Sequence, residues 1–125
     1  MDIRRRVDDV SLAFKWLTHD FAVAGQIGPA DVAQAVAAGF RSVINNRPDF
    51  EGGPAQPTSQ AIHDAAGAAG VEYVFLPVRS GYQDPAQIAQ MHELLERLPK
   101  PVLAFCRSGA RSANLYYNAQ ALARR

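Results

Sequence analysis

Short apolar segments alternate with amphipathic segments along most of this chain, and this alternation limits the fold more than any other feature. The segments Phe21–Ala24, Ser42–Asn45 and Pro101–Phe105 read as buried strands, and Val71–Val78, rich in β-branched and aromatic residues, as another. Strands that alternate with helices form crossover units, which place parallel strands side by side beneath helices. The sequence therefore predicts an α/β fold, a single domain with a mostly parallel sheet flanked by helices.

Residues that start and stop helices mark the segments between these strands. Asp84 is a predicted N-cap, Pro85 occupies a first helical position, and Pro99 follows an apolar stripe. Residues 46–57 contain two glycines and three prolines without periodicity, which indicates a loop. The first expected helix begins at Pro29 and stops at Gly39, the second runs from a cap at Thr58 or Ser59 to about Ala69 before Gly70, the third runs from Pro85 to Leu98, and the last runs from about Ser112 to the terminus.

Composition excludes several classes of function. The 125 residues are the size of one domain, and a net charge of +1 gives no footprint for nucleic acid or an anionic membrane. The single cysteine, Cys106, rules out an internal disulfide and a zinc site built on several cysteines, and no two of the three histidines have metal-ligand spacing. We expect no cofactor, no signal peptide and a cytoplasmic location.

The strongest chemical signal lies where the last apolar strand ends, in the run Cys106-Arg107-Ser108-Gly109-Ala110-Arg111-Ser112. A tight loop of this kind points backbone N–H groups at an anion, and the following helix adds the positive end of its dipole. Together with Arg111 these groups lower a thiol pKa from about 8.5 into a range of about 3.5 to 7.5, which makes the thiolate a nucleophile. We expect Cys106 and Arg111 to be catalytic and residues 107–112 to bind the anion.

Each of these residues also has a plainer interpretation. Cys106 would be a small core hydrophobe at a strand end, but an arginine at a helix N-terminus, as Arg111 is, opposes the macrodipole unless an anion lies nearby. Arg107 stays open as a solvated side chain. Ser112 is either the N-cap of the last helix or a donor to the thiolate. Gly109 supplies a positive φ or a close backbone approach.

Two runs, Asn45-Asn46-Arg47-Pro48-Asp49-Phe50-Glu51 and Cys106 to Ser112, carry a resemblance to a known family. With Gly25-Gln26-Ile27 and Tyr73 to Val78, the chain resembles the phosphatase-like domain of beta-lactamase hydrolase-like proteins over about residues 20–120. The resemblance implies a dual-specificity-phosphatase-like fold and members described as phosphatase-like or as sulfurtransferases. It also implies a persulfide dioxygenase as a functional partner, because some members are fused to one. We expect no such second domain here.

The first twenty residues depart from that family pattern. Apolar residues such as Leu12, Phe14 and Trp16 indicate a helix or strand docked on the core. We therefore predict an N-terminal extension packed on the core over residues 1–20, followed by the phosphatase-like or sulfurtransferase domain over residues 21–125.

Loop length and the general acid separate two chemistries. Cysteine phosphatases have five residues between nucleophile and arginine, whereas four separate Cys106 from Arg111, which is similar to the active loop of rhodaneses. Expelling an alkoxide needs a proton donor, and the nearest carboxylate, Asp84, is better explained as a helix N-cap. Sulfur transfer needs no acid. We therefore expect a rhodanese-like sulfurtransferase that moves sulfane sulfur from a small donor, through a Cys106 persulfide, to a low-molecular-weight or protein thiol.

Two other functions stay open. One is a cysteine-dependent phosphatase of the dual-specificity type, with a phosphorylated substrate, a cysteinyl-phosphate intermediate and Asp84 as a weak general-acid candidate. The other is a non-catalytic module that binds an anion or a persulfide. Arg47, Asp49 and Glu51 share the sheet edge of Cys106. Arg47 would be a second contact for the anion, and Asp49 and Glu51 would contact the substrate or only position Arg47 or Arg111. An Asx-type turn with solvated charges is the alternative.

Overall fold

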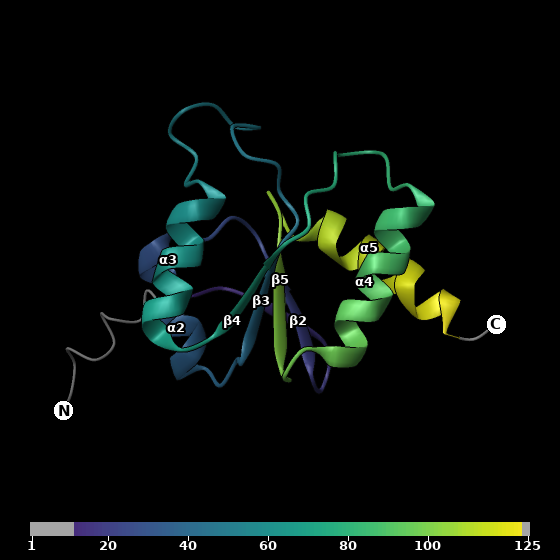
Figure 1. The fold of residues 1–125 in the computed structure, drawn as a ribbon, viewed down its shortest axis with the longest axis horizontal. Coiled ribbons are helices and arrows are strands. Elements are labelled where there is room, and N and C mark those ends of the chain that lie inside the picture. The colour runs from purple at the N-terminus through teal and green to yellow at the C-terminus, as the bar shows by residue number, and fades with distance from the viewer. Residues whose placement is uncertain (1–11, 124–125) are drawn as a thin grey trace.

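The computed structural model describes residues 12–123, which form one sheet with helices on both faces (Figure 1). The strand order is β1-β2-β5-β3-β4. Helices α2 and α3 cover one face and α4 and α5 the other. The elements are β1 (Lys15–Thr18), β2 (Phe21–Ala24), α2 (Pro29–Ala37), β3 (Ser42–Asn45), α3 (Ser59–Ala69), β4 (Glu72–Phe75), α4 (Pro85–Arg97), β5 (Val102–Phe105) and α5 (Ala110–Leu122). The predicted α/β architecture is confirmed.

Strands β2, β5, β3 and β4 are parallel, so their carboxyl ends meet at one edge of the sheet. The register places Phe105, the last residue of β5, between Ala24 of β2 and Asn45 of β3. The loops that follow β3 and β4 rise above this edge at the top of Figure 1. Residues far apart in sequence therefore open onto the same edge, where ligands bind in sheets of this type.

Side chains alternate between the two faces of the sheet along each central strand. In β5, Val102 and Ala104 pack into the cluster beneath α4 and α5. Leu103 and Phe105 pack into the cluster beneath α2 and α3. All of β2, β3 and β5 is buried, which explains why these strands appear in the sequence as continuous apolar runs.

Two expected boundaries are wrong. The segment Val71–Val78 is not a buried strand, because β4 covers only Glu72–Phe75 and lies at the sheet edge with Phe75 exposed. The last helix begins at Ala110, two residues before Ser112, and its N-cap is Gly109. Ser112 therefore lies inside the first turn and is not a cap.

The described part of the N-terminal extension joins the sheet. Strand β1 pairs with β2 in antiparallel fashion, and Phe14 and Trp16 pack against Phe40 with ring centroids 5.0 and 5.1 Å apart. Residues 1–11 of the predicted extension lie outside the described residues. Within residues 12–123, no helix is long and apolar enough to cross a membrane, and no cluster of His, Cys, Asp and Glu could hold a metal ion.

Candidate active site

Cys106 lies directly after β5, and the following loop curls around its sulfur. The residue is 1% exposed. The Gly109 amide donates a hydrogen bond to Cys106 Sγ at 3.1 Å. Gly109 has φ +97°, and a Cβ at this position would lie 3.4 Å from the backbone of Ala24. Glycine is therefore favoured here by the left-handed backbone conformation, while a Cβ would only come into contact with the backbone of β2.

Hydrogen bonds to the Cys106 thiolate dominate its ionisation. Burial raises the pKa of the thiol, but the amide and hydroxyl of Ser112 and the amides of Gly109 and Ser108 outweigh burial and hold the pKa below its ordinary value. This direction is the one expected from the sequence. The groups that lower the pKa are the loop amides, as expected, and Ser112; Arg111, which we expected to add to them, is not among them.

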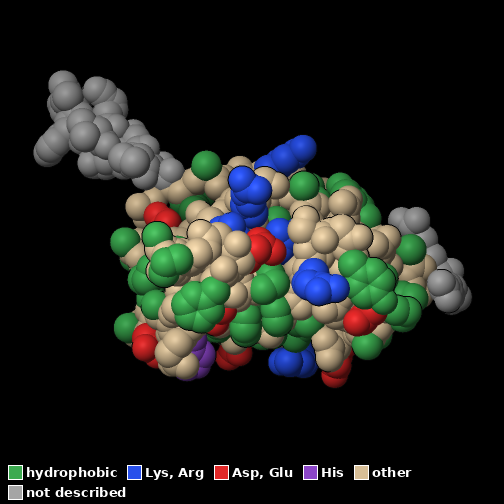
Figure 2. Space-filling view, turned by 90° about the horizontal axis from the view of Figure 1, so that it is seen from above, with side chains coloured by type: hydrophobic (Ala, Val, Ile, Leu, Met, Phe, Trp, Pro, Cys, Tyr) green, Lys and Arg blue, Asp and Glu red, His purple; other side chains and the backbone are tan. Residues whose placement is uncertain are grey.

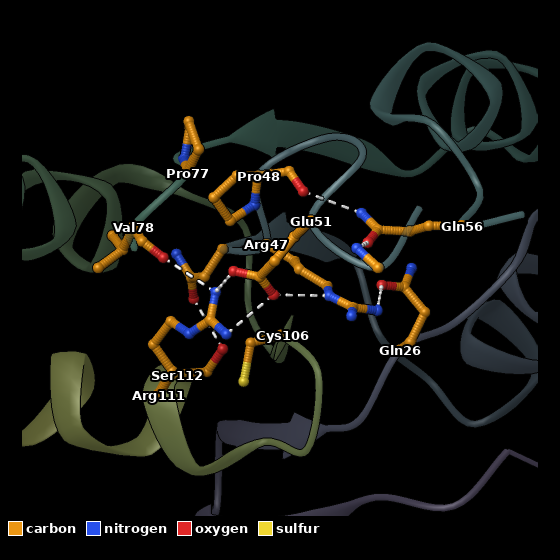
Figure 3. A network of polar contacts seen from close by, with 12 residues as sticks. Gln26, Arg47, Pro48, Glu51, Gln56, Pro77, Val78, Cys106, Arg111 and Ser112 are labelled. Atoms are coloured by element: carbon orange, nitrogen blue, oxygen red, sulfur yellow. Dashed lines mark hydrogen bonds and ion pairs between the residues drawn. The ribbon is translucent and has the colours of Figure 1, made fainter. Parts of the chain in front are cut away.

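Arg111 is held in place by the loop that follows β3. Its Nη1 and Nη2 donate to Oε2 and Oε1 of Glu51, each at 3.1 Å, and Nη1 also donates to the Val78 carbonyl at 2.9 Å (Figure 3). The side chain is 9% exposed. Its Nε atom is buried and has no hydrogen-bond partner in the described part of the chain. A buried donor of this kind favours an acceptor brought by a ligand.

Glu51 bridges two arginines. Arg47 Nε donates to Glu51 Oε1 at 2.8 Å, and Arg47 Nη1 donates to Gln26 Oε1 at 3.1 Å. Burial raises the pKa of Glu51. Arg111 and Arg47 outweigh this effect through their hydrogen bonds and their positive charges, and hold the pKa below its usual value. Glu51 is thus a carboxylate that positions Arg111, which agrees with one of the two roles considered from the sequence.

Two candidate carboxylates lie elsewhere. Asp49 Oδ1 accepts the Ser59 amide at 2.8 Å, so Asp49 ties the loop to the start of α3 and contacts neither arginine. Asp84 accepts the Gln87 amide at 2.9 Å as the N-cap of α4 and does not line the pocket above Cys106. The position of Asp84 therefore favours the helix cap over the general acid.

Asn46 and Gln26 also support the site, although no role is expected for either from the sequence. Asn46 is fully buried, accepts the Ser112 hydroxyl at 2.8 Å and donates to the Leu76 carbonyl at 2.9 Å, so it joins the cysteine loop to the strands beside it. Asn45 Oδ1 accepts the Arg47 amide at 2.8 Å, which is the expected Asx-type turn. Asn46 could have been found from the sequence, because a polar residue directly after a buried parallel strand lies at the edge of the sheet where ligands bind.

A pocket of about 610 Å³ opens above Cys106. Figure 2 looks onto this face and shows basic side chains gathered near its middle around an acidic one. Among residues 12–123, the pocket walls include two arginines but no carboxylate. Ala110 also lines the pocket, and its amide donates to Ser108 Oγ at 3.4 Å. The lining residues are Ser80, Gly81, Tyr82, Gln83, Cys106, Arg107, Ser108, Ala110, Arg111, Asn114, Tyr117 and Asn118.

Comparison with known sequences identifies the family. The family model for the phosphatase-like domain of beta-lactamase hydrolase-like protein matches residues 13–123. A beta-lactamase hydrolase-like protein of Agrobacterium fabrum is 40% identical over 100 residues, which cover 80% of this chain and 23% of that protein. The chain belongs to this family, as the resemblance predicted, and spans less than a quarter of the length of that relative.

Solved structures share the fold. A provisionally assigned phosphatase of Neisseria meningitidis is 29% identical with a TM-score of 0.75, over 82% of this chain and 72% of that one. A kinase-associated phosphatase, solved with serine in place of its catalytic cysteine, is 13% identical with a TM-score of 0.68, over 90% of this chain and 77% of that one. The predicted dual-specificity-phosphatase-like fold is confirmed.

Proposed function

We propose that this member of the beta-lactamase hydrolase-like phosphatase family is a cysteine-dependent phosphatase that works through a cysteinyl-phosphate intermediate. The observation that carries the proposal is the 3.1 Å contact from the Gly109 amide to Cys106 Sγ. This amide and those of Ser108 and Ser112 act on the sulfur at the N-terminus of α5, where a phosphoryl group bound to that sulfur would receive donors of the same kind.

The residues of the loop suit both steps of this reaction. The Cys106 thiolate attacks phosphorus, a sulfur–phosphorus bond forms, and the bond to the leaving oxygen breaks with the electron pair on that oxygen. Loop amides and Arg111 stabilise the charge on the phosphoryl oxygens. Water then attacks phosphorus, the sulfur–phosphorus bond breaks, and the thiolate returns as phosphate leaves with the protons of the water.

Sulfur transfer, the function expected first from the sequence, is the second candidate. Two observations favour it. Four residues separate Cys106 from Arg111, and none of the residues between 12 and 123 that line the pocket is a carboxylate. In that reaction the same thiolate would take a sulfane sulfur from a small donor and pass it to a thiol. The fold and the described relatives favour phosphate over sulfur, so we place it second.

Two parallel assays test the proposal. The wild type is incubated with p-nitrophenyl phosphate, and separately with thiosulfate and cyanide, with Cys106→Ser as the matched control in each. We expect release of p-nitrophenol that the Cys106→Ser variant lacks, and little thiocyanate. Thiocyanate formation that depends on Cys106, without hydrolysis of the aryl phosphate, would replace phosphatase with sulfurtransferase.

A further inference from the structure

The wall of the pocket above Cys106 carries a second arginine, Arg107, in addition to Arg111. Arg111, on the floor, already pairs with Glu51. Arg107 is exposed on the wall and forms no ion pair with any residue between 12 and 123. Uncharged side chains make up much of the remaining wall, among them Gln83 and Asn118. A second anion beside the cysteine loop would therefore meet an unpaired guanidinium and no repelling carboxylate from the described residues.

The backbone of Arg107 is fixed next to the nucleophile. Its carbonyl oxygen accepts the Gln26 amide at 3.2 Å. A Cβ on Gly25 would lie 3.0 Å from the same oxygen, so β2 approaches the loop as closely as backbone packing allows. The Arg107 backbone is therefore fixed beside Cys106, and the side chain can reach a ligand by rotation about its own bonds.

The wall residues also limit which leaving groups can depart. A phenol has a pKa of about 10 and leaves poorly without a proton donor. A phosphate monoester has a second pKa of about 6, so it can leave as an anion near neutral pH. With Asp84 engaged as a helix cap, the described pocket walls offer no carboxylic acid to a leaving oxygen.

We propose that the substrate is a phosphoanhydride, an organic diphosphate whose terminal phosphoryl group enters the Cys106 loop while Arg107 holds the phosphate that leaves. This inference rests on the proposed phosphatase function. The thiolate attacks the terminal phosphorus, the bond to the bridging oxygen breaks, and the monophosphate departs with the electron pair. Water then cleaves the cysteinyl phosphate, so the sum of both steps is hydrolysis of the anhydride.

The rim of the pocket suits the organic part of such a substrate. Tyr82 and Tyr117 are 58% and 55% exposed, and both line the pocket. Asn118 Nδ2 donates to Gln83 Oε1 at 2.8 Å, which ties the loop after β4 to α5 and holds the two walls together. An aromatic ring or sugar attached to the leaving phosphate would contact these tyrosines.

The test compares kcat/KM for three kinds of substrate on the whole chain: ADP or inorganic pyrophosphate, phenyl phosphate, and p-nitrophenyl phosphate. We expect the anhydrides to be hydrolysed at least about 10-fold better than phenyl phosphate, whose leaving group needs a proton. Arg107→Gln should lower the ratio of ADP to p-nitrophenyl phosphate activity by about 10- to 100-fold, the usual effect of a charge-assisted contact. Arg41→Gln, which removes the same charge at the opposite edge of the sheet, should leave that ratio unchanged.

The outcomes separate this inference from the proposed function. Hydrolysis of p-nitrophenyl phosphate without hydrolysis of either anhydride overturns the inference and leaves the phosphatase intact. An Arg107→Gln variant with an unchanged ratio also overturns it, as does phenyl phosphate turned over as fast as ADP. No Cys106-dependent hydrolysis of any of these substrates overturns the phosphatase proposal and this inference with it.

Discussion

Glu51 contacts Arg111 through both of its carboxylate oxygens, each at 3.1 Å, across a separation of sixty residues in the sequence. The arginine of the cysteine loop is therefore aimed by the loop after β3 and not by its own loop. Arg47 contacts the same carboxylate at 2.8 Å, so one negative charge bridges the two guanidinium groups.

Replacing Glu51 should release Arg111. In Glu51→Gln the neutral amide offers a single acceptor, and the two arginines lose the charge between them. We expect kcat/KM for p-nitrophenyl phosphate to fall by about 10- to 100-fold, as for loss of a charged hydrogen bond, and the melting temperature to fall. Asp49→Asn is the control on the same loop, because it keeps an acceptor for the Ser59 amide and should retain activity. Equal activity of both variants would remove the positioning role of Glu51.

The Cys106 thiol should ionise at a lower pH than a free cysteine. Its hydrogen bonds hold the pKa below the ordinary value for a thiol, so the thiolate forms at a lower pH than in a free cysteine. The rate of alkylation by iodoacetamide should therefore rise to its plateau at lower pH than for a model thiol. Ser112→Ala removes a hydroxyl that contributes to the lowered pKa and should move the midpoint upward. A midpoint in the wild type at or above the free-thiol value would contradict the account of the loop.

Gly109 should be required for activity beyond its contribution to stability. Gly109→Ala puts a Cβ at φ +97° against β2, whereas Gly39→Ala introduces a similar strain at φ +102° with nothing within 4 Å. Both variants should lose about 1–2 kcal/mol of unfolding free energy in urea, the cost of a left-handed non-glycine residue. Only Gly109→Ala should also lose activity, because its amide contacts Cys106 Sγ. An active Gly109→Ala variant would show that the loop tolerates displacement.

Asp84 should matter for stability and not for catalysis. Asp84→Ala removes the cap of α4 and should cost about 1 kcal/mol, whereas Asp84→Asn keeps an acceptor and should cost much less. Both variants should hydrolyse p-nitrophenyl phosphate and phenyl phosphate with unchanged kcat. A selective loss of phenyl phosphate hydrolysis in Asp84→Asn would instead identify Asp84 as the proton donor.

Much of the fold was predictable because local signals agree with the tertiary structure. Gly70 ends α3 in a left-handed conformation, and Asp84 with Pro85 starts α4, at the boundaries expected from the sequence. The strand predicted at Val71–Val78 was too long, because β-branched residues favour a strand but do not show whether it is central or at an edge of the sheet. The start of α5 was misplaced because serine is the stronger N-cap, whereas the chain turns into the helix at Gly109, which adopts a left-handed conformation with φ +97°.

The candidate site was predictable in its nucleophile and less so in its support. Cys106 and Arg111 follow from one short run, since a strand end, glycine and arginines are contiguous there. The contacts of Glu51 with Arg111 and of Asn46 with Ser112 join segments at least sixty residues apart. Asp49 and Glu51 have similar side chains two positions apart, and only the path of the loop sends one to α3 and the other to Arg111.

The most direct measurement is chemical trapping of the intermediate on Cys106. The protein is mixed with p-nitrophenyl phosphate, denatured within the first turnovers and analysed by intact mass and peptide mapping, with Cys106→Ser alongside. The phosphatase account predicts a phosphoryl group on the Cys106 peptide of the wild type and none on the variant. An unmodified Cys106 during active hydrolysis, or a sulfur adduct formed from thiosulfate in a protein that never accepts phosphoryl, would contradict it.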